Sequence, residues 1–152
     1  MDYAPCLTQV TPAPLAVISA RVAPDHVGHV VFAALDRVHA ALRAGAHGRL
    51  GEDVVLCEPS DDGMLDLRIG VRLERPFAGM GKVAAWATPG GEAVHVTHTG
   101  AYSQRAAAHA AARAVAERLG RGLTGVYWEV HGAYARGARP IEVYHEVEPA
   151  HG

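Results

Sequence analysis

The stretch VYWEVHG, residues 126–132, carries side chains that could do acid–base chemistry. Its aromatic and β-branched residues are typical of a strand, in which every second side chain points to the same face. Tyr127, Glu129 and His131 are therefore predicted to share one face. On that face His131 could pair with Glu129 and hold the carboxylate ionised. The carboxylate could also act as a general base on water or protonate a leaving group.

The surroundings of Glu129 decide between catalysis, ligand binding and a plain structural role. A carboxylate among aromatic side chains is costly to desolvate, so we expect its pKa to be raised. A bound cation would offset that cost, and aromatic faces would add cation–π attraction. The simpler interpretation is a carboxylate that faces water, or one that pairs with Arg68 or Arg72.

Four further aromatic residues are candidates for the same site. Tyr102 lies at a predicted strand-to-helix junction, where it either packs over the sheet or offers its ring or hydroxyl to a ligand. Tyr144 is expected on the face of Glu129. Trp128 is expected on the opposite face, in the core beneath a helix, unless a bulge changes the register and turns it into the pocket. Trp86, in KVAAWAT, suits the core and the wall of a groove equally.

These side chains must be positioned by a fold that repeats itself. Each half of the chain has a predicted strand, then a helix, then two strands, and the first helix has its apolar residues at helical spacing. The strands are PLAVISARV, VVLCE and MLDLRIGVRLE in the first half, and TPGGEAVHVTHTG, GVYWEV and IEVYHEVE in the second. We predict one domain over residues 1–152, with β-α-β-β repeats at about 12–76 and 82–149. The expected fold is α+β, an antiparallel sheet with pseudo-twofold symmetry and both helices on one face.

Alternation along the last two strands predicts which side chains face the helices. The predicted helix-facing set is apolar, with His145 as the exception: Val126, Trp128, Val130, Ile141, Val143 and Val147. The predicted opposite set is acidic and aromatic: Tyr127, Glu129, His131, Glu142, Tyr144 and Glu146. If the two repeats pack side by side, the second set is expected to border a groove between them.

Composition argues against several classes of protein. Hydrophobic residues make up 49% of the 152 residues and charged residues 20%, as in globular domains. The net charge of −2 and the lack of a Lys/Arg run argue against direct nucleic-acid binding. Two cysteines are too few for a disulfide scaffold, and the ten histidines show no familiar metal-ligand spacing, so we expect no metal and no cofactor. Without a signal peptide or an apolar run of about 20 residues, we expect a cytoplasmic protein with no membrane contact.

Three stretches of the second half carry a resemblance to a known family. TPGGEAVHVTHTGAYSQ, VYWEVHG and IEVYHEVEP resemble, in this order, strands of the GyrI-like small-molecule-binding family, the effector-binding domain of multidrug-responsive regulators. LRIGVRL is similar to a strand of that family's first repeat. The resemblance implies two fused β-α-β-β modules with a ligand cleft between them and Glu129 at its base. The family often has a tyrosine where this chain has His131, and no helix-turn-helix precedes Pro12, so the resemblance is to the stand-alone form.

Two main functions are compatible with the resemblance. The first is binding of a hydrophobic, aromatic small molecule, cationic ones included, for drug sensing, sequestration or resistance. The expected ligand-binding residues are Tyr102, Tyr127, Glu129, His131 and Tyr144, with Trp86 and Trp128. The alternative is a hydrolase that opens a strained, cyclopropane-type natural product, with Glu129 directing water and Tyr102 or Tyr127 polarising the substrate. A shielded protein target and a homodimer are left open by the sequence.

Overall fold

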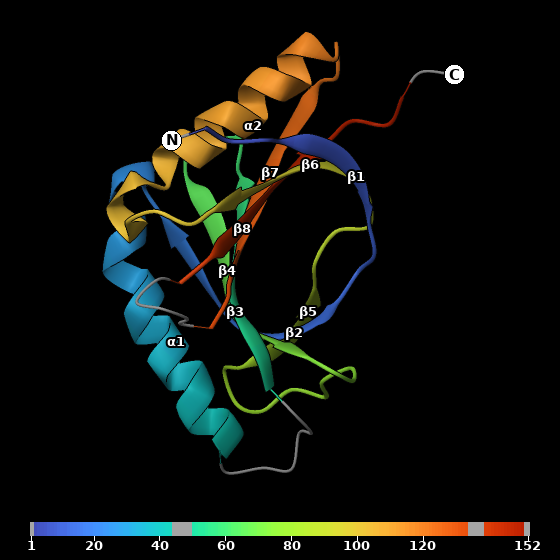
Figure 1. The fold of residues 1–152 in the computed structure, drawn as a ribbon. Helices are drawn as coiled ribbons and strands as arrows, with labels where there is room; N and C mark the ends of the chain where they lie inside the picture. Colours follow the sequence, from blue (N-terminus) through green and yellow to red (C-terminus); the bar gives the residue numbers. More distant parts are fainter. Residues whose placement is uncertain (1, 44–49, 134–138, 151–152) are drawn as a thin grey trace. The chain divides into compact units, whose positions relative to one another are not determined.

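The computed structural model describes residues 2–43, 50–133 and 139–150, which form eight strands and two α-helices. The chain divides into two compact units, each with four strands and one α-helix (Figure 1). We call Pro12–Thr88 the first-half unit, and Met1–Thr11 with Pro89–Gly152 the second-half unit. Among the described residues, neighbouring strands within each unit pair antiparallel, so the fold is α+β, as predicted.

The first-half unit consists of a four-stranded sheet and one long helix. The strand order in the sheet is β3-β4-β2-β5. Its elements are β2 (Pro14–Val22), the short 3-10 helix η1 (Pro24–His26), α1 (Val27–Arg43), β3 (Leu50–Pro59), β4 (Leu65–Leu73) and β5 (Ala84–Ala87).

Helix α1 packs on one face of this sheet through apolar side chains. The buried residues of α1 recur at helical spacing: Val31, Ala34, Leu35, Val38 and Leu42. On β4 the alternate residues Leu67, Ile69 and Val71 are fully buried, as the alternation of LRIGVRL predicted. The polar exception is His39, whose Nε2 lies 2.7 Å from Asp53 Oδ1 on β3.

The second-half unit has the equivalent arrangement. Its strand order is β1-β6-β8-β7. Its elements are β1 (Cys6–Val10), β6 (Gly91–His98), the short 3-10 helix η2 (Tyr102–Gln104), α2 (Ala106–Arg118), β7 (Leu123–His131) and β8 (Ile141–Val147). Helix α2 packs on β6 and β8 (Figure 1). Its small residues Ala108, Ala112 and Ala116 share a buried cluster with Val94, Val96 and Val143.

The predicted repeat is present. Each unit has four strands where the sequence analysis predicted three. The order β2-α1-β3-β4 is repeated as β6-α2-β7-β8, and the sheet orders β3-β4-β2 and β7-β8-β6 correspond. The additional strands are the edge strands β1, which pairs with β6, and β5, which pairs with β2. They have five and four residues, too few for a period-two pattern to distinguish them from loops.

The predicted faces of β7 are wrong. Residues directly opposite in an antiparallel pair share a face, and Glu129 lies opposite Val143 while Trp128 lies opposite Tyr144. Glu129 therefore points toward α2 with the apolar residues of β8, and Trp128 points away from α2. Both are buried, with exposures of 7% for Glu129 and 3% for Trp128. Because both faces are covered at this point, hydrophobicity alone does not identify the helix-facing one.

Among the described residues, neither α1 nor α2 is long and apolar enough to cross a bilayer.

Candidate functional site

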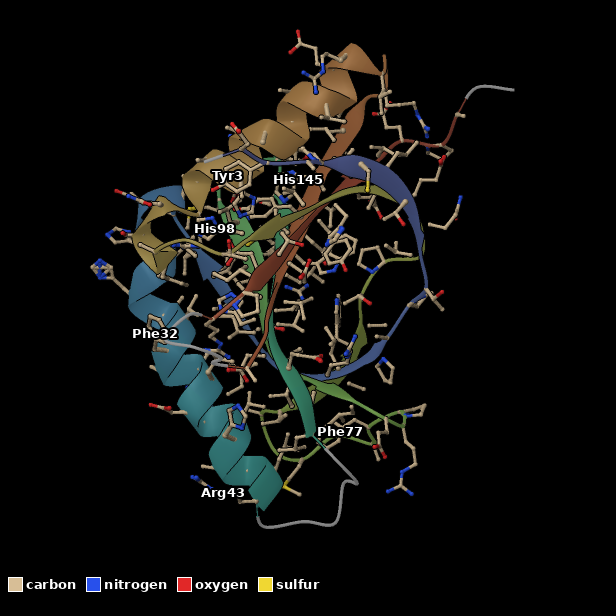
Figure 2. All side chains as sticks on the ribbon, in the orientation of Figure 1. Tyr3, Phe32, Arg43, Phe77, His98 and His145 are labelled. Atoms are coloured by element: carbon tan, nitrogen blue, oxygen red, sulfur yellow. The ribbon has the colours of Figure 1, made fainter. Side chains whose placement is uncertain are left out.

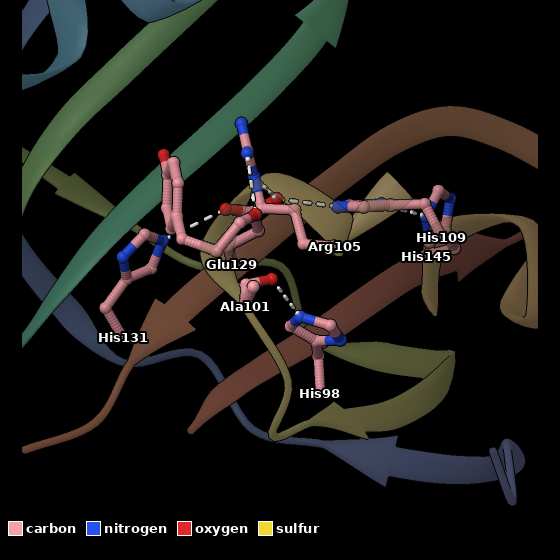
Figure 3. A network of polar contacts seen from close by, with 8 residues as sticks. His98, Ala101, Arg105, His109, Glu129, His131 and His145 are labelled. Carbon is pink, nitrogen blue, oxygen red and sulfur yellow. Dashed lines mark hydrogen bonds and ion pairs between the residues drawn. The ribbon is translucent and has the colours of Figure 1, made fainter. Parts of the chain in front are cut away.

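A buried carboxylate, Glu129 on β7, is the centre of a polar network beneath the start of α2 (Figure 3). Glu129 Oε2 accepts hydrogen bonds from Arg105 Nε at 3.1 Å and from His109 Nε2 at 2.6 Å. Glu129 Oε1 accepts one from His131 Nε2 at 3.0 Å. Arg105 and His109 are four residues apart and so lie on one face of the helix start. Both carboxylate oxygens thus have protein donors.

The network keeps Glu129 ionised. Burial on its own raises the pKa of this carboxyl group, but the hydrogen bonds from His109 and His131 and the charges of His109 and Arg105 outweigh it. The net pKa is far below its usual range. The expected raised pKa is therefore wrong, because charged and hydrogen-bonding groups surround the carboxylate where aromatic rings alone were expected. The predicted pairing of His131 with Glu129 is present.

The network continues through a second histidine. His109 Nδ1 and His145 Nε2, on β8, lie 2.8 Å apart, so the two imidazoles share one proton between these nitrogens. Burial lowers the pKa of His145 to about 3, with the charges of His109 and Arg113 contributing. His145 is therefore neutral near pH 7. The ring of Tyr127 stacks on His145 with centroids 5.2 Å apart, which closes this end of the network.

At the other end Tyr102 connects the network to the surface. Tyr102 is 38% exposed, and its ring lies 5.9 Å from that of His131. The guanidinium carbon of Arg105 lies 4.1 Å from the centre of the Tyr102 ring, a cation–π contact. Burial raises the pKa of the Tyr102 hydroxyl. The negative charge of Glu129 raises this pKa further, and the positive charge of Arg105 lowers it in part. Arg105 thus occupies both the carboxylate and the aromatic face that a cation would use here.

The sheet face opposite α2 carries a second constellation, a ladder of three stacked rings. His95 on β6 stacks on Tyr144 on β8 with centroids 4.7 Å apart, and Tyr144 stacks on Trp128 on β7 at 5.0 Å and an interplanar angle of 9°. Beside the ladder, Glu142 Oε2 accepts hydrogen bonds from His95 and from Thr97 Oγ1. In the described part of the chain, Glu142 Oε1 has no hydrogen-bond partner, which distinguishes this carboxylate from Glu129.

The residues predicted for one site are divided between three places. Tyr102, Tyr127, Glu129 and His131 lie together on the α2 side. Trp128 and Tyr144 lie on the opposite face, so the predictions that Tyr144 shares the face of Glu129 and that Trp128 lies beneath a helix are wrong. Glu142 and Glu146 also lie on that opposite face. Trp86 belongs to the first-half unit. The cleft between the repeats stays a prediction.

Four participants were not predicted from the sequence. They are Arg105, His109, His145 and His95, to which the sequence analysis assigned no role in the site. The spacing of four between Arg105 and His109 was the available signal, since it gives two basic residues one helical face. Only the strand register then indicates that this face meets Glu129.

The histidines and carboxylates pair with each other in preference to forming a metal site. Among the described residues, no group of three or more His, Cys, Asp or Glu side chains is arranged to hold a metal ion. In the network, His109 and His131 each direct a nitrogen at an oxygen of Glu129, as donors to a carboxylate do.

Several solved structures share the fold of this chain. SAV2435, solved with tetraphenylphosphonium, is 16% identical to this chain, with a TM-score of 0.70. The match covers 97% of this chain and 94% of the SAV2435 chain. The C-terminal domain of EcmrR is 16% identical, with a TM-score of 0.76. The match covers 99% of this chain and 100% of the EcmrR domain. A hydrolase encoded by lin2189 from Listeria innocua is 13% identical, with a TM-score of 0.62. The match covers 95% of this chain and 91% of the hydrolase chain.

These likenesses establish the fold. The fold is that of the GyrI-like domains, as the resemblance implied, and the matches extend over nearly the whole chain. A scan against protein-family models finds no match, and neither does a search of curated protein sequences.

Proposed function

We propose that the chain binds a hydrophobic, aromatic small molecule, lipophilic cations included, on the sheet face that carries the ring ladder. The observation that carries the proposal is the ladder of His95, Tyr144 and Trp128 beside the half-satisfied carboxylate of Glu142. Small-molecule sites typically combine aromatic walls with a few polar groups that fix the orientation of the ligand. A role in drug sensing, sequestration or resistance accords with such a site.

The contrast between the two carboxylates supports Glu142 as the residue that attracts a ligand cation. Glu129 is buried and uses both oxygens for protein donors, so a ligand cation would have to displace Arg105 or a histidine. The side chain of Glu142 is 33% exposed, and both of its protein donors contact the same oxygen. A cation can therefore approach the other oxygen without breaking an existing hydrogen bond.

The structural likenesses support the same class of ligand. SAV2435 has this fold and was solved with tetraphenylphosphonium, a cation surrounded by four aromatic rings. In our proposal the rings of such a ligand contact the ladder, and its positive charge lies near Glu142.

The test is a titration of the Trp86→Phe variant with tetraphenylphosphonium. This variant retains Trp128 as its single tryptophan, so quenching of its fluorescence reports on the ladder. Glu142→Gln is expected to weaken binding of the cation about five- to tenfold, and binding of the neutral triphenylphosphine oxide less than twofold. Glu146→Gln, on the same strand and face, is the matched control and is expected to change neither. Equal effects of the two substitutions, or no saturable quenching, would refute the proposal.

A hydrolase is the second candidate, favoured by the pair of Glu129 and His131 beside the partly exposed Tyr102. A carboxylate with so low a pKa is a weak base, so in such an enzyme Glu129 would orient His131, and His131 would take the proton from water. Water would add across the strained carbon–carbon bond of the substrate. Incubation with a cyclopropane-bearing natural product would then yield a product heavier by one water, at a rate reduced about 10²-fold or more in His131→Gln. An unchanged substrate mass with the wild-type protein excludes this candidate for that substrate.

A further inference from the structure

The face of the first-half sheet that points away from α1 carries three arginines with unequal partners. Cross-strand pairing places Arg21, Arg68 and Arg72 on this face. Arg21 pairs with Asp62 and, at 3.4 Å, with Asp66, while Arg72 pairs with Glu52. Among the described residues no carboxylate pairs with Arg68, which lies between the other two.

Arg68 is also left with an unused hydrogen-bond donor. Within the described ranges its buried Nε has no hydrogen-bond partner, and its Nη1 makes a long contact of 3.4 Å with the carbonyl oxygen of Leu67. A buried donor without an acceptor destabilises the protein, and more so when it belongs to a charged group. An anion that reached Arg68 would supply both the missing acceptor and the missing charge.

The neighbours of Arg68 indicate what else such an anion would contain. The guanidinium carbon lies 4.3 Å from the centre of the Trp86 ring, and Trp86 is 40% exposed. Ser19 lies opposite Arg68 on β2 and is exposed, which offers a hydroxyl to the ligand. Leu56 lies opposite on β3 and is buried, which makes the floor of the face apolar. The indole of Trp86 and the side chain of Leu56 favour an aromatic ring in the ligand, and the guanidinium of Arg68 favours a carboxylate.

We propose that Arg68 and Trp86 form a binding site for a flat aromatic carboxylate in the first-half unit. The carboxylate accepts hydrogen bonds from the guanidinium of Arg68, and the aromatic ring of the ligand packs against the exposed part of Trp86. Asp66 does not compete for Arg68, because it is engaged by Arg21. This site differs from the one under Proposed function in its unit, in its residues and in the charge of its ligand.

The proposal is tested by calorimetric titration of the wild-type protein with 2-naphthoate and with its neutral isostere 2-naphthamide. We expect saturable binding of the acid, and binding of the amide that is weaker by about tenfold or more. This comparison needs no variant, so it stands whether or not a substituted protein folds. Equal affinity for acid and amide, or no binding of the acid up to millimolar concentration, would overturn the proposal.

Variants then identify the residues involved. Arg68→Gln is expected to weaken naphthoate binding about tenfold or more, whereas Arg72→Gln, an arginine of the same face with its own carboxylate, is expected to change it by less than about threefold. Trp86→Leu is expected to weaken naphthoate binding about fivefold, since it removes the aromatic contact. Thermal melting confirms that each variant is folded.

Two results would contradict the assignment of these residues. The first is an Arg72→Gln effect as large as that of Arg68→Gln, which would indicate general charge attraction. The second is competition by inorganic phosphate at the same concentration as naphthoate, which would show that the ring of the ligand contributes nothing.

Discussion

The helix–sheet interfaces of the two units are built on the same order of elements but from different side chains. Helix α1 buries valine, leucine and alanine, and it also carries a sheet-facing polar pair, His39 with Asp53, in which the His39 side chain is 36% exposed. Helix α2 buries four small or medium apolar residues and His109, which reaches the ionised Glu129 (Figure 3). The first interface is apolar apart from this partly exposed pair, whereas the second buries a charge with three donors.

A repeat can therefore keep its topology while its interior changes from apolar packing to a hydrogen-bonded network. Alanines on α2 bring the helix close to the sheet, and the polar network fills the space near the start of the helix. Such a network is stable only while all of its members are satisfied. The second-half unit should therefore be the more sensitive of the two to single substitutions and to pH.

The largest expected effect separates the two tryptophans. Trp128→Ala is expected to lower the free energy of unfolding by about 3–5 kcal/mol, because it removes a buried ring from the ladder. Trp86→Ala is expected to cost less than about 1.5 kcal/mol, because that ring is partly exposed already. Urea denaturation followed by circular dichroism measures both. Similar losses in the two variants would contradict the difference between the units.

The next effect compares the two helix histidines that pair with a strand carboxylate. His109→Ala is expected to cost about 2–3 kcal/mol, since it removes one of the two donors to the buried Glu129 Oε2 and takes away the partner of His145 Nε2. His39→Ala breaks a pair of nearly the same length, 2.7 Å against 2.6 Å, at a more exposed position, and is expected to cost less than about 1 kcal/mol. The same denaturation experiment measures the difference, and a His39→Ala cost equal to that of His109→Ala would show that burial is not what matters.

The smallest effect is a dependence of stability on pH. His145 has a pKa of about 3 in the folded protein and about 6.5 when unfolded, so below pH 6.5 the unfolded chain binds more protons and the folded state loses stability. We expect a loss of about 1–2 kcal/mol between pH 6.5 and pH 5 that His145→Gln abolishes. Glu129 acts in the same direction but below its unfolded pKa of about 4.3, outside this window. Denaturation at pH 5, 6 and 7 measures the slope, and an unchanged slope in the variant would contradict the assignment to His145.

Much of the fold could be predicted from periodicity. Helix α1 and strand β4 each have one apolar face, and that pattern depends only on local spacing. Strands β1 and β5 could not be predicted in the same way, because edge strands of five and four residues have too few alternations. Their pairing is determined by the sheets they join.

Less of the site could be predicted, and the limit was the pairing of strands. The pair of Glu129 and His131 followed from their spacing of two along one strand. The partners Arg105, His109 and His145 lie on other elements, so finding them required the register of β7 with β8 and the face of α2. Trp128 was assigned to the wrong face because the strand is buried on both sides at this point. A hydrophobic residue therefore fits either face, whereas on a half-exposed sheet it would fit only one.

The place of β1 has a consequence for the order in which the chain can fold during synthesis. β1 pairs with β6, and Tyr3 donates a hydrogen bond to His98 Nδ1 at 2.7 Å across 95 positions of sequence (Figure 2). As the ribosome releases the chain, residues 12–88 can complete their unit while the first eleven residues still lack a partner. The second-half unit closes only when its last strand, Ile141–Val147, has emerged. β1 is thus made before residues 12–88 but fixed only after them, so it stays an exposed, unpaired strand of the nascent chain while the first-half unit folds.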